Sequence, residues 1–261
     1  MSLTITSFQR RRVLDDLCFS YVFKSKLSVS IEHMTEVVVV LGSKPGAYLP
    51  EIRPLVVYGA NNSVELGLRY REQGARIVGF VPTAELKRHE HIRQSFVKAQ
   101  PDEVILVGDA EDDALEFFKT LGVHTNNVRV MPFSERSQLF FHVLGWGAWA
   151  VAFKTLLSRG FRFFVTEVVP DFFAKNNKEW LGHSTGLTAI LYALQKHPTA
   201  QVVTAGIGLQ AGEHFNQVGT FTSKTAQADQ LTVRHWPPQN RPRLYTTDDA
   251  MHTIGHVQKW Q

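Results

Sequence analysis

Residues Gly182–Asn216, GHSTGLTAILYALQKHPTAQVVTAGIGLQAGEHFN, combine a polar loop, an amphipathic helix, an apolar strand and a glycine-rich loop. The helix carries apolar residues at the i, i+3, i+4 and i+7 spacing of one buried face. These residues are Leu187, Ile190, Leu191 and Leu194. Either Ser184 or Thr185 can cap the first turn through its hydroxyl. Because hydroxyls, free N–H groups and the helix dipole favour negative charge, the stretch predicts an anion site at the start of the helix.

Strands and helices alternate on both sides of this stretch. The run EVVVVL at Glu36–Leu41 is typical of a strand that is buried on both faces. The other predicted strands are Pro54–Tyr58, Ala75–Val81, Glu103–Gly108, Asn127–Pro132, Phe161–Val169 and Gln201–Ala205. This alternation predicts an α/β fold with a Rossmann-like, doubly wound and mostly parallel sheet.

The chain shows no repeat or linker, so we expect a single domain at residues 34–261. Residues 1–33 show no clean period and are interpreted as an N-terminal appendage. They form either a short helix around Val13–Phe23 that docks on a partner or a membrane surface, or an extension that precedes a natural start at Met34.

Two loops near the N-terminal end of this domain are candidates for nucleotide binding. Gly42, Ser43 and Lys44 follow the first predicted strand, where α/β folds usually place nucleotide phosphates. The spacing GSKPG is neither the dinucleotide fingerprint nor a Walker loop, and the alternative is a plain strand-to-helix turn. Asn61 and Asn62 follow the second strand, although asparagine is also common in turns.

The Ser-Thr-Gly loop, the helix, the strand that ends in a glycine pair and the histidine soon after it resemble the small sialylmotif of sialyltransferases. They equally resemble bacterial Kdo (3-deoxy-manno-octulosonate) transferases of lipopolysaccharide and capsule assembly. The first two strand–loop units resemble the large sialylmotif more loosely. Those families place an asparagine directly after the second strand, where this chain has Tyr58. The resemblance therefore assigns that role to Asn61 or Asn62, or the role is lost.

The resemblance implies an inverting glycosyltransferase that moves Kdo or sialic acid from its CMP donor to a glycan or lipopolysaccharide-type acceptor. It implies His214 as the base for the acceptor hydroxyl and no cofactor besides the donor. The chain has no Asp-x-Asp motif or convincing ligand cluster, so we expect no metal. The residues expected to bind the nucleotide are Gly42, Ser43, Lys44, Asn61, Asn62, His183, Ser184, Thr185 and Gly186.

One departure from the family pattern leaves alternatives open. Sialyltransferases carry another histidine shortly before an acidic residue, and this chain has Ala226 at that position while it retains Asp229. Either His214 acts as the base, another group such as His183 does, or activity is altered or absent. The competing interpretations are a non-catalytic nucleotide- or glycan-binding protein and another nucleotide-dependent Rossmann-like enzyme.

Three further side chains have both a functional and a structural interpretation. Asp109 can hold an acceptor hydroxyl, but it more readily caps the helix predicted after it. Trp146 and Trp149 can stack on a sugar, but large aromatic residues at helical spacing are more often core, which is the interpretation we favour.

The bulk composition restricts the partners and the cellular compartment that we expect for the protein. A formal net charge of +4 and a pI near 9.2 favour an anionic sugar nucleotide, an anionic glycolipid or an acidic membrane face. We expect no nucleic-acid partner, because no basic stripe is interleaved with aromatic residues. Cys18 is the one cysteine, and no apolar run is long enough to span a membrane. These features predict a cytoplasmic enzyme, with peripheral contact to the inner membrane as an option.

Overall fold

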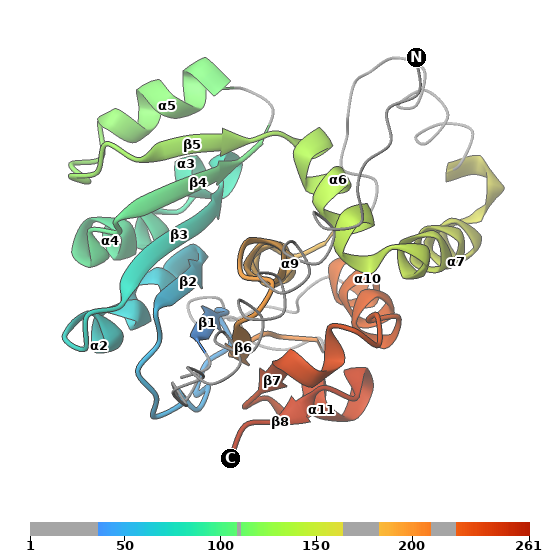
Figure 1. Cartoon of the computed structure of the whole chain (residues 1–261). Helices are drawn as coiled ribbons and strands as arrows, with labels where there is room; N and C mark the ends of the chain where they lie inside the picture. The colour runs from blue at the N-terminus through green and yellow to red at the C-terminus, as the bar shows by residue number, and fades with distance from the viewer. Residues whose placement is uncertain (1–35, 109–110, 164–182, 210–222) are drawn as a thin grey trace, which may run out of the picture. The chain divides into compact units, whose positions relative to one another are not determined.

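Eight strands form one parallel sheet in the order β5-β4-β3-β2-β1-β6-β7-β8 (Figure 1). The structure is a computed structural model that describes residues 36–108, 111–163, 183–209 and 223–261. The strands are β1 (Val37–Leu41), β2 (Val56–Ala60), β3 (Arg76–Pro82), β4 (Glu103–Val107), β5 (Val128–Met131), β6 (Gln201–Ala205), β7 (Leu244–Thr246) and β8 (Gln258–Lys259). The predicted doubly wound, mostly parallel sheet is confirmed, and every pairing between these strands is parallel.

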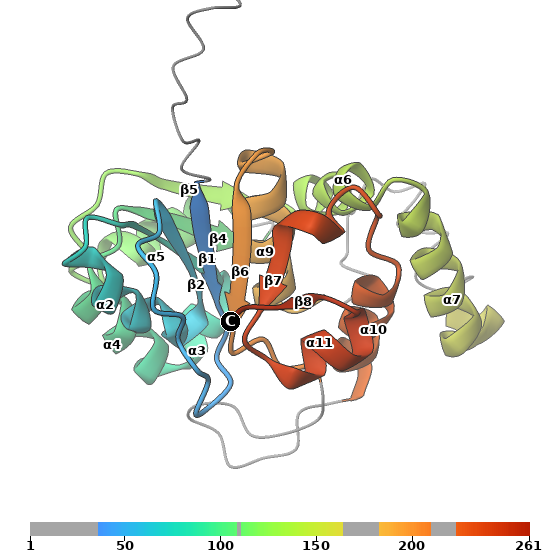
Figure 2. The same cartoon turned by 60° about the horizontal axis from the view of Figure 1, so that its bottom comes forward.

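Helices cover both faces of the sheet (Figures 1 and 2). The 3-10 helix η1 (Asn61–Gly67) and helices α2 (Leu68–Arg71), α3 (Thr83–Arg88), α4 (Glu90–Ala99) and α5 (Glu111–Lys119) come between β2 and β5. The later helices are α6 (Phe133–Leu144), α7 (Trp146–Phe163), α9 (Thr185–Lys196), α10 (Ser223–Arg234), the 3-10 turn η3 (Arg241–Arg243) and α11 (Asp249–Gly255). In Figure 1, α2, α4 and α5 lie on one side of the sheet and α6, α9 and α10 on the other.

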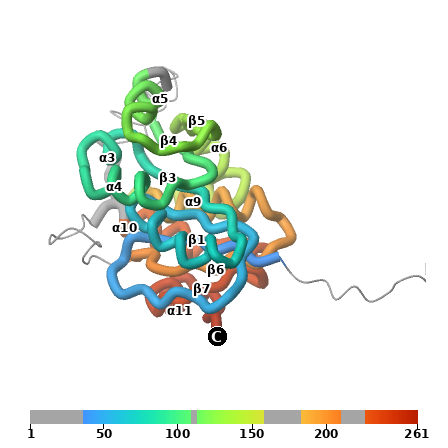
Figure 3. Tube along the Cα trace, turned by 90° about the vertical axis from the view of Figure 1, so that its left-hand side faces the viewer, coloured from blue at the N-terminus to red at the C-terminus, as the bar shows by residue number. Residues whose placement is uncertain are grey.

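The direction of the chain reverses once across the sheet, between β1 and β6. The chain adds β2 to β5 outward on one side of β1, and after α6, α7 and α9 it places β6 on the other side. Figure 3 shows β4, β3, β1, β6 and β7 in this order across the sheet. Val38 pairs with Val202 and Leu41 with Ala205. In open parallel sheets, ligands bind beyond the carboxyl ends of the strands at such a switch point. The carboxyl ends of β1 and β6 are therefore the first place to look for a site.

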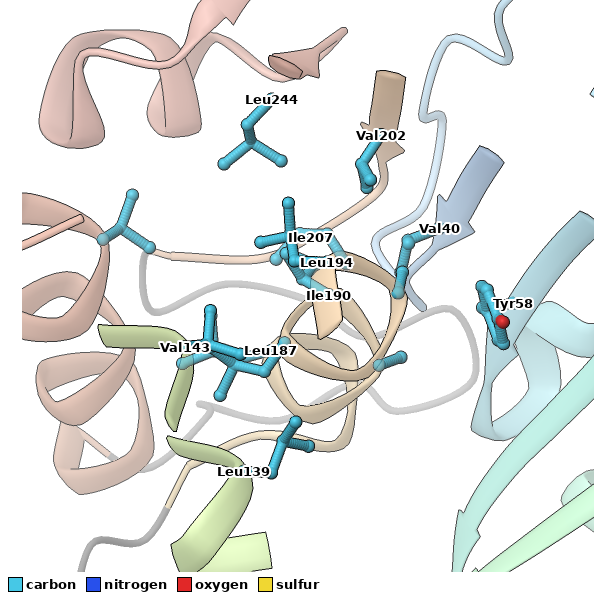
Figure 4. Close-up of a cluster of buried hydrophobic side chains, with 14 of the residues drawn as sticks. Val40, Tyr58, Leu139, Val143, Leu187, Ile190, Leu194, Val202, Ile207 and Leu244 are labelled. Atoms are coloured by element: carbon cyan, nitrogen blue, oxygen red, sulfur yellow. The ribbon is translucent and has the colours of Figure 1, made fainter. Parts of the chain in front are cut away.

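Strand β1 contributes side chains to two separate cores. Val38 and Val40 pack in the cluster that contains α9, while Val39 and Leu41 pack in a cluster on the opposite face. Successive residues of a strand point to opposite faces, so a strand covered on both sides must be apolar throughout. Figure 4 shows Val40, Tyr58 and Val202 around the apolar face of α9, which includes Leu187, Ile190 and Leu194.

Helix α7 differs from its prediction in two ways. Residues 161–163 end α7 and do not begin a strand, and residues 164–169 of the predicted strand lie outside the described residues. The core interpretation of two tryptophans is wrong, because Trp146 is 90% exposed and Trp149 is 63% exposed. Gly145 has a φ of 54°, and α7 bends away from α6 by 119° at this point. Beyond the bend, α7 keeps Ala148 and Val151 in the core, while both tryptophans are exposed.

Among the described residues, no single helix is long and apolar enough to cross a membrane. The segments Phe133–Leu144 and Trp146–Leu157 reach that length and composition only when they are taken together across their bend.

Candidate functional site

The loops after β1 and β6 are bonded to each other through their backbones. The N–H of Gly42 donates to the carbonyl of Ala205 at 2.8 Å, and the N–H of Lys44 donates to the carbonyl of Gly206 at 3.0 Å. A Cβ on Gly42 would lie 2.2 Å from the Gly206 carbonyl oxygen, and Gly206 itself has a φ of +73°. Only glycine fits this close backbone approach. The predicted loop at Gly42 therefore lies at the switch point beside the glycine loop of β6.

The loop after β1 runs to β2 without a helix. Residues 42–55 contain no helical segment, and all of them are described. The interpretation of this loop as a plain strand-to-helix turn is therefore wrong. The helix whose start lies at the switch point is α9, which precedes β6 in the chain.

The end of β2 and the loop after it are hydrogen-bonded to the end of β1 and to the loop after β1. The Ser43 hydroxyl donates to the Ala60 carbonyl at 3.0 Å, and the Ser63 hydroxyl lies 2.7 Å from the Leu41 carbonyl. Asn61 adopts a left-handed backbone with φ 56°, which asparagine tolerates better than most residues. Its Oδ1 is buried and has no hydrogen-bond partner among the described residues. The neighbouring Asn62 is 7% exposed.

The start of α9 and the loop after β1 both lie against the side chain of Ile207, which belongs to the glycine loop after β6. Ser184 caps the helix, since its Oγ accepts a hydrogen bond from the Leu187 N–H at 3.1 Å. Of the two predicted caps, Ser184 is thus confirmed. A Cβ on Gly186 would lie 3.0 Å from Cδ1 of Ile207, and a Cβ on Gly42 would lie 2.8 Å from the same atom. Gly42 and Gly186, which are far apart in the sequence, therefore converge on Ile207.

Two buried charged residues form hydrogen bonds with the backbone of the Ser184 loop. Oδ1 of Asp229, which is 0% exposed, accepts a hydrogen bond from the Ser184 N–H at 3.0 Å. The guanidinium of Arg136 donates to the carbonyls of His183 and Ser184. The Ser184 amide is therefore engaged within the protein. Thr185 and Gly186 remain as the first-turn residues whose N–H groups have no partner inside a helix.

His183 lies in the interior, although it belongs to the predicted nucleotide site. It is 7% exposed, its ring centroid is 4.6 Å from that of Phe140, and its Nε2 is 2.9 Å from Oγ1 of Thr232. Thr232 donates its hydroxyl proton to the Ala228 carbonyl, so Nε2 of His183 carries the proton and donates to Thr232. This geometry links α6 and α10, and it supports a structural role for the imidazole.

Asp248 is a residue of this site that sequence reasoning missed. It is 5% exposed, and its Oδ2 accepts a hydrogen bond from the Ile207 N–H at 3.0 Å. Burial raises the pKa of this carboxyl, while the bond from Ile207 and the positive charge of Lys44 act in the opposite direction. A buried carboxyl with a shifted pKa at a switch point is a candidate functional group. The sequence signal for it was an acidic residue directly after an extended segment.

The remaining predicted residues are only partly described. His214 and Asp109 lie outside the described residues. Ala226, which replaces the second family histidine, is buried on α10 with 4% exposure. Lys44 is exposed at the start of its loop.

A pocket of about 390 Å³ lies between α6 and α9. It is lined by Glu135, Gln138, Leu139, His142, Tyr192 and Gln195. None of the predicted site residues lines this pocket. Within the described part of the chain, no group of three or more His, Cys, Asp or Glu residues can hold a metal ion.

The loss of Asp229 should destabilise the fold. Asp229→Ala leaves the Ser184 N–H without its acceptor and removes a negative charge near the buried guanidinium of Arg136. We expect the free energy of unfolding to fall by about 3 kcal/mol, measured by urea denaturation. Asp249→Ala is the matched control, because its carboxylate is exposed and pairs with Lys259 at the surface. That control should change stability by less than about 0.5 kcal/mol. Equal losses in both variants would contradict the role of Asp229.

Comparison of the chain with protein-family models, with curated proteins and with solved structures finds no match.

Proposed function

We propose that the protein is an inverting glycosyltransferase that moves a 2-keto-3-deoxy acid sugar, Kdo or sialic acid, from its CMP donor. The acceptor in this proposal is a glycan or a lipopolysaccharide-type glycolipid. The observation that carries the proposal is the convergence of Gly42 and Gly186 on Ile207 at the switch point of the sheet.

This convergence supports the binding of a single phosphate. The N–H groups of Thr185 and Gly186 begin α9, where the helix dipole favours an anion. Lys44 is exposed on the adjoining loop, whose backbone is bonded to Gly206. A phosphate held between these groups would be stabilised as it departs from the sugar. The tight approach of the two glycine loops suits a nucleotide whose phosphate must come close to the backbone.

Asn61 supports the binding of the nucleoside. Its Oδ1 is a buried acceptor without a partner among the described residues, at the carboxyl end of β2. Buried acceptors without partners are rare because they lose their bonds to water. The cytosine amino group or a ribose hydroxyl is a donor that would meet this need. Of the two asparagines in this loop, the geometry therefore favours Asn61.

The proposed chemistry is a displacement at the anomeric carbon of the sugar. The acceptor hydroxyl forms a bond to this carbon, the bond to the CMP phosphate oxygen breaks, and CMP leaves with the bonding electrons. The proton of the hydroxyl passes to a base, for which we propose His214, because an imidazole titrates near neutral pH. The alternative base, His183, is disfavoured because its Nε2 bonds to Thr232 in the interior.

A nicotinamide-dependent enzyme fits the geometry less well. Dinucleotide sites of the Rossmann type place the pyrophosphate on a helix that directly follows the first strand. Here residues 42–55 connect β1 to β2 without a helix, and β2 is followed by Asn61 where such enzymes carry an acidic residue. A non-catalytic nucleotide- or glycan-binding protein is the second candidate, and it is favoured by Ala226 at the position of the second family histidine.

Thermal unfolding with nucleotides tests the proposal. We expect CMP to raise the melting temperature selectively over CDP, UDP, NAD and NADP. At a hundredfold excess over its dissociation constant, a ligand stabilises the folded state by about 2.7 kcal/mol. For a protein of this size, that corresponds to roughly 5–10 °C. Turnover of CMP-Kdo or CMP-sialic acid then separates the enzyme from a binding protein. Selective stabilisation by NAD or NADP would overturn the proposal.

A further inference from the structure

Helix α7 carries a line of large apolar side chains on its outer surface, which we name the α7 stripe. It consists of Trp146, Trp149, Phe153 and Leu157, whose spacing of three, four and four residues puts them on one face of the helix. All four are exposed, from 61% for Phe153 to 90% for Trp146. Scattered exposed apolar residues are common in proteins, but a contiguous row of four with two tryptophans marks an interaction surface.

The preceding helix shows that the stripe is not a displaced part of the core. Helix α6 buries Leu139, Phe140, Val143 and Leu144 against α9 and the sheet. Helix α7 then turns away by 119°, and Figure 2 shows it beyond α6 and α10, on the side away from the strands. Its inner residues Ala148 and Val151 belong to the main core. The stripe is therefore the outward face of a helix whose opposite face is already packed.

The exposed charges that the structure describes on α7 and on the helix packed against it are positive. Lys154 is the one charged residue among the described side chains of α7. Helix α10 packs on α7 and ends at Arg234, which is exposed, while its one acidic residue, Asp229, is buried. Lys154 is exposed on α7, and its Nζ lies 2.9 Å from Nε2 of His235. An apolar face next to cationic side chains complements a layer of anionic headgroups above acyl chains.

We propose that the α7 stripe binds the interface of an anionic lipid membrane and holds the protein at its surface. Tryptophan is enriched at this depth because its ring is apolar while its N–H bonds to headgroups or water. The stripe extends for roughly 16 Å along the helix, about half of the hydrocarbon thickness of a bilayer. The helix therefore lies in the plane of the interface and does not cross it. This inference does not depend on the transfer reaction proposed above.

Flotation of the full-length protein with lipid vesicles tests this inference. We expect binding to vesicles of phosphatidylglycerol and phosphatidylcholine, and weaker binding to phosphatidylcholine alone. The variant Trp146→Ser/Trp149→Ser/Phe153→Ser should lose at least about tenfold in affinity for the anionic vesicles. Added salt should weaken binding of the unsubstituted protein, because salt screens attraction to the headgroups. Lipids brominated in their acyl chains should quench the tryptophan fluorescence of the unsubstituted protein.

Tyr48→Ser/Val97→Ser is the matched control, because both residues are exposed apolar side chains outside α7. This double variant should bind vesicles as the unsubstituted protein does. The triple variant loses the contact between the rings of Trp149 and Phe141, whose centroids are 5.1 Å apart, so its melting temperature should fall, but it should remain folded at the temperature of the assay. Equal vesicle binding by the triple variant would overturn the inference, because the contact would then lie elsewhere in the chain. A failure of the unsubstituted protein to bind vesicles would overturn it as well. So would a dimer that the triple variant converts to a monomer without any vesicle binding, since a second copy would then cover the stripe.

Discussion

Gly42→Ala is expected to destabilise the protein by about 3 kcal/mol or more. The new Cβ would lie 2.2 Å from the carbonyl oxygen of Gly206 and 2.8 Å from Cδ1 of Ile207. The first of these contacts is with backbone, which cannot move aside as a flexible side chain can. The loops after β1 and β6 would have to separate, breaking the bonds from Gly42 to Ala205 and from Lys44 to Gly206. Overpacking of a tight interior typically costs about 1–3 kcal/mol, and the lost hydrogen bonds add to this.

Urea denaturation of Gly42→Ala and Gly208→Ala measures this effect against a close control. Gly208 lies in the same glycine loop after β6, and a Cβ there would meet nothing within 4 Å. Its substitution should change the free energy of unfolding by less than about 0.5 kcal/mol. If the proposed phosphate site is correct, Gly42→Ala should also lose the thermal shift with CMP at temperatures where it remains folded. A Gly42→Ala protein as stable as Gly208→Ala would contradict the close approach of the two loops.

His214→Ala is expected to lower the turnover of CMP-Kdo or CMP-sialic acid by about 10²- to 10⁴-fold. That range is the usual contribution of a general base. The thermal shift with CMP should stay unchanged, because the proposed phosphate and nucleoside contacts come from Lys44, Asn61 and the start of α9. A loss of turnover together with retained binding of CMP would therefore identify His214 as the base.

His124→Ala serves as the control for this substitution. His124 is an exposed histidine that precedes β5, at the amino end of that strand and away from the switch point. Its loss should leave both turnover and the CMP shift as they are in the unsubstituted protein. Full activity of His214→Ala would remove His214 from the mechanism. Stabilisation by CMP without turnover in the unsubstituted protein would favour the non-catalytic binding protein.

Local features of the sequence predicted most of the fold. The β-branched run before Gly42 predicted a strand buried on both faces, and β1 is fully enclosed at Val38 to Leu41. The periodic leucines after Ser184 predicted α9 and its cap, because the cap and the buried stripe depend only on residues within two turns. The segment between β3 and β4 forms two helices, α3 and α4, which are separated at His89, whose φ of −111° departs from helical geometry.

The sequence alone predicted the strands β1 to β6, a mostly parallel sheet and the capped helix α9, but it missed β7 and β8 and assigned the end of α7 to a strand. The tertiary structure decided which of these residues meet. It brought Gly42 and Gly186 to Ile207, put Asp248 against the same loop, placed His183 inside against Thr232 and left Trp146 exposed. The physical reason is that periodicity shows which side chains share a face but not what covers that face. Covering depends on contacts between residues distant in the chain, such as the pairing of β1 with β6.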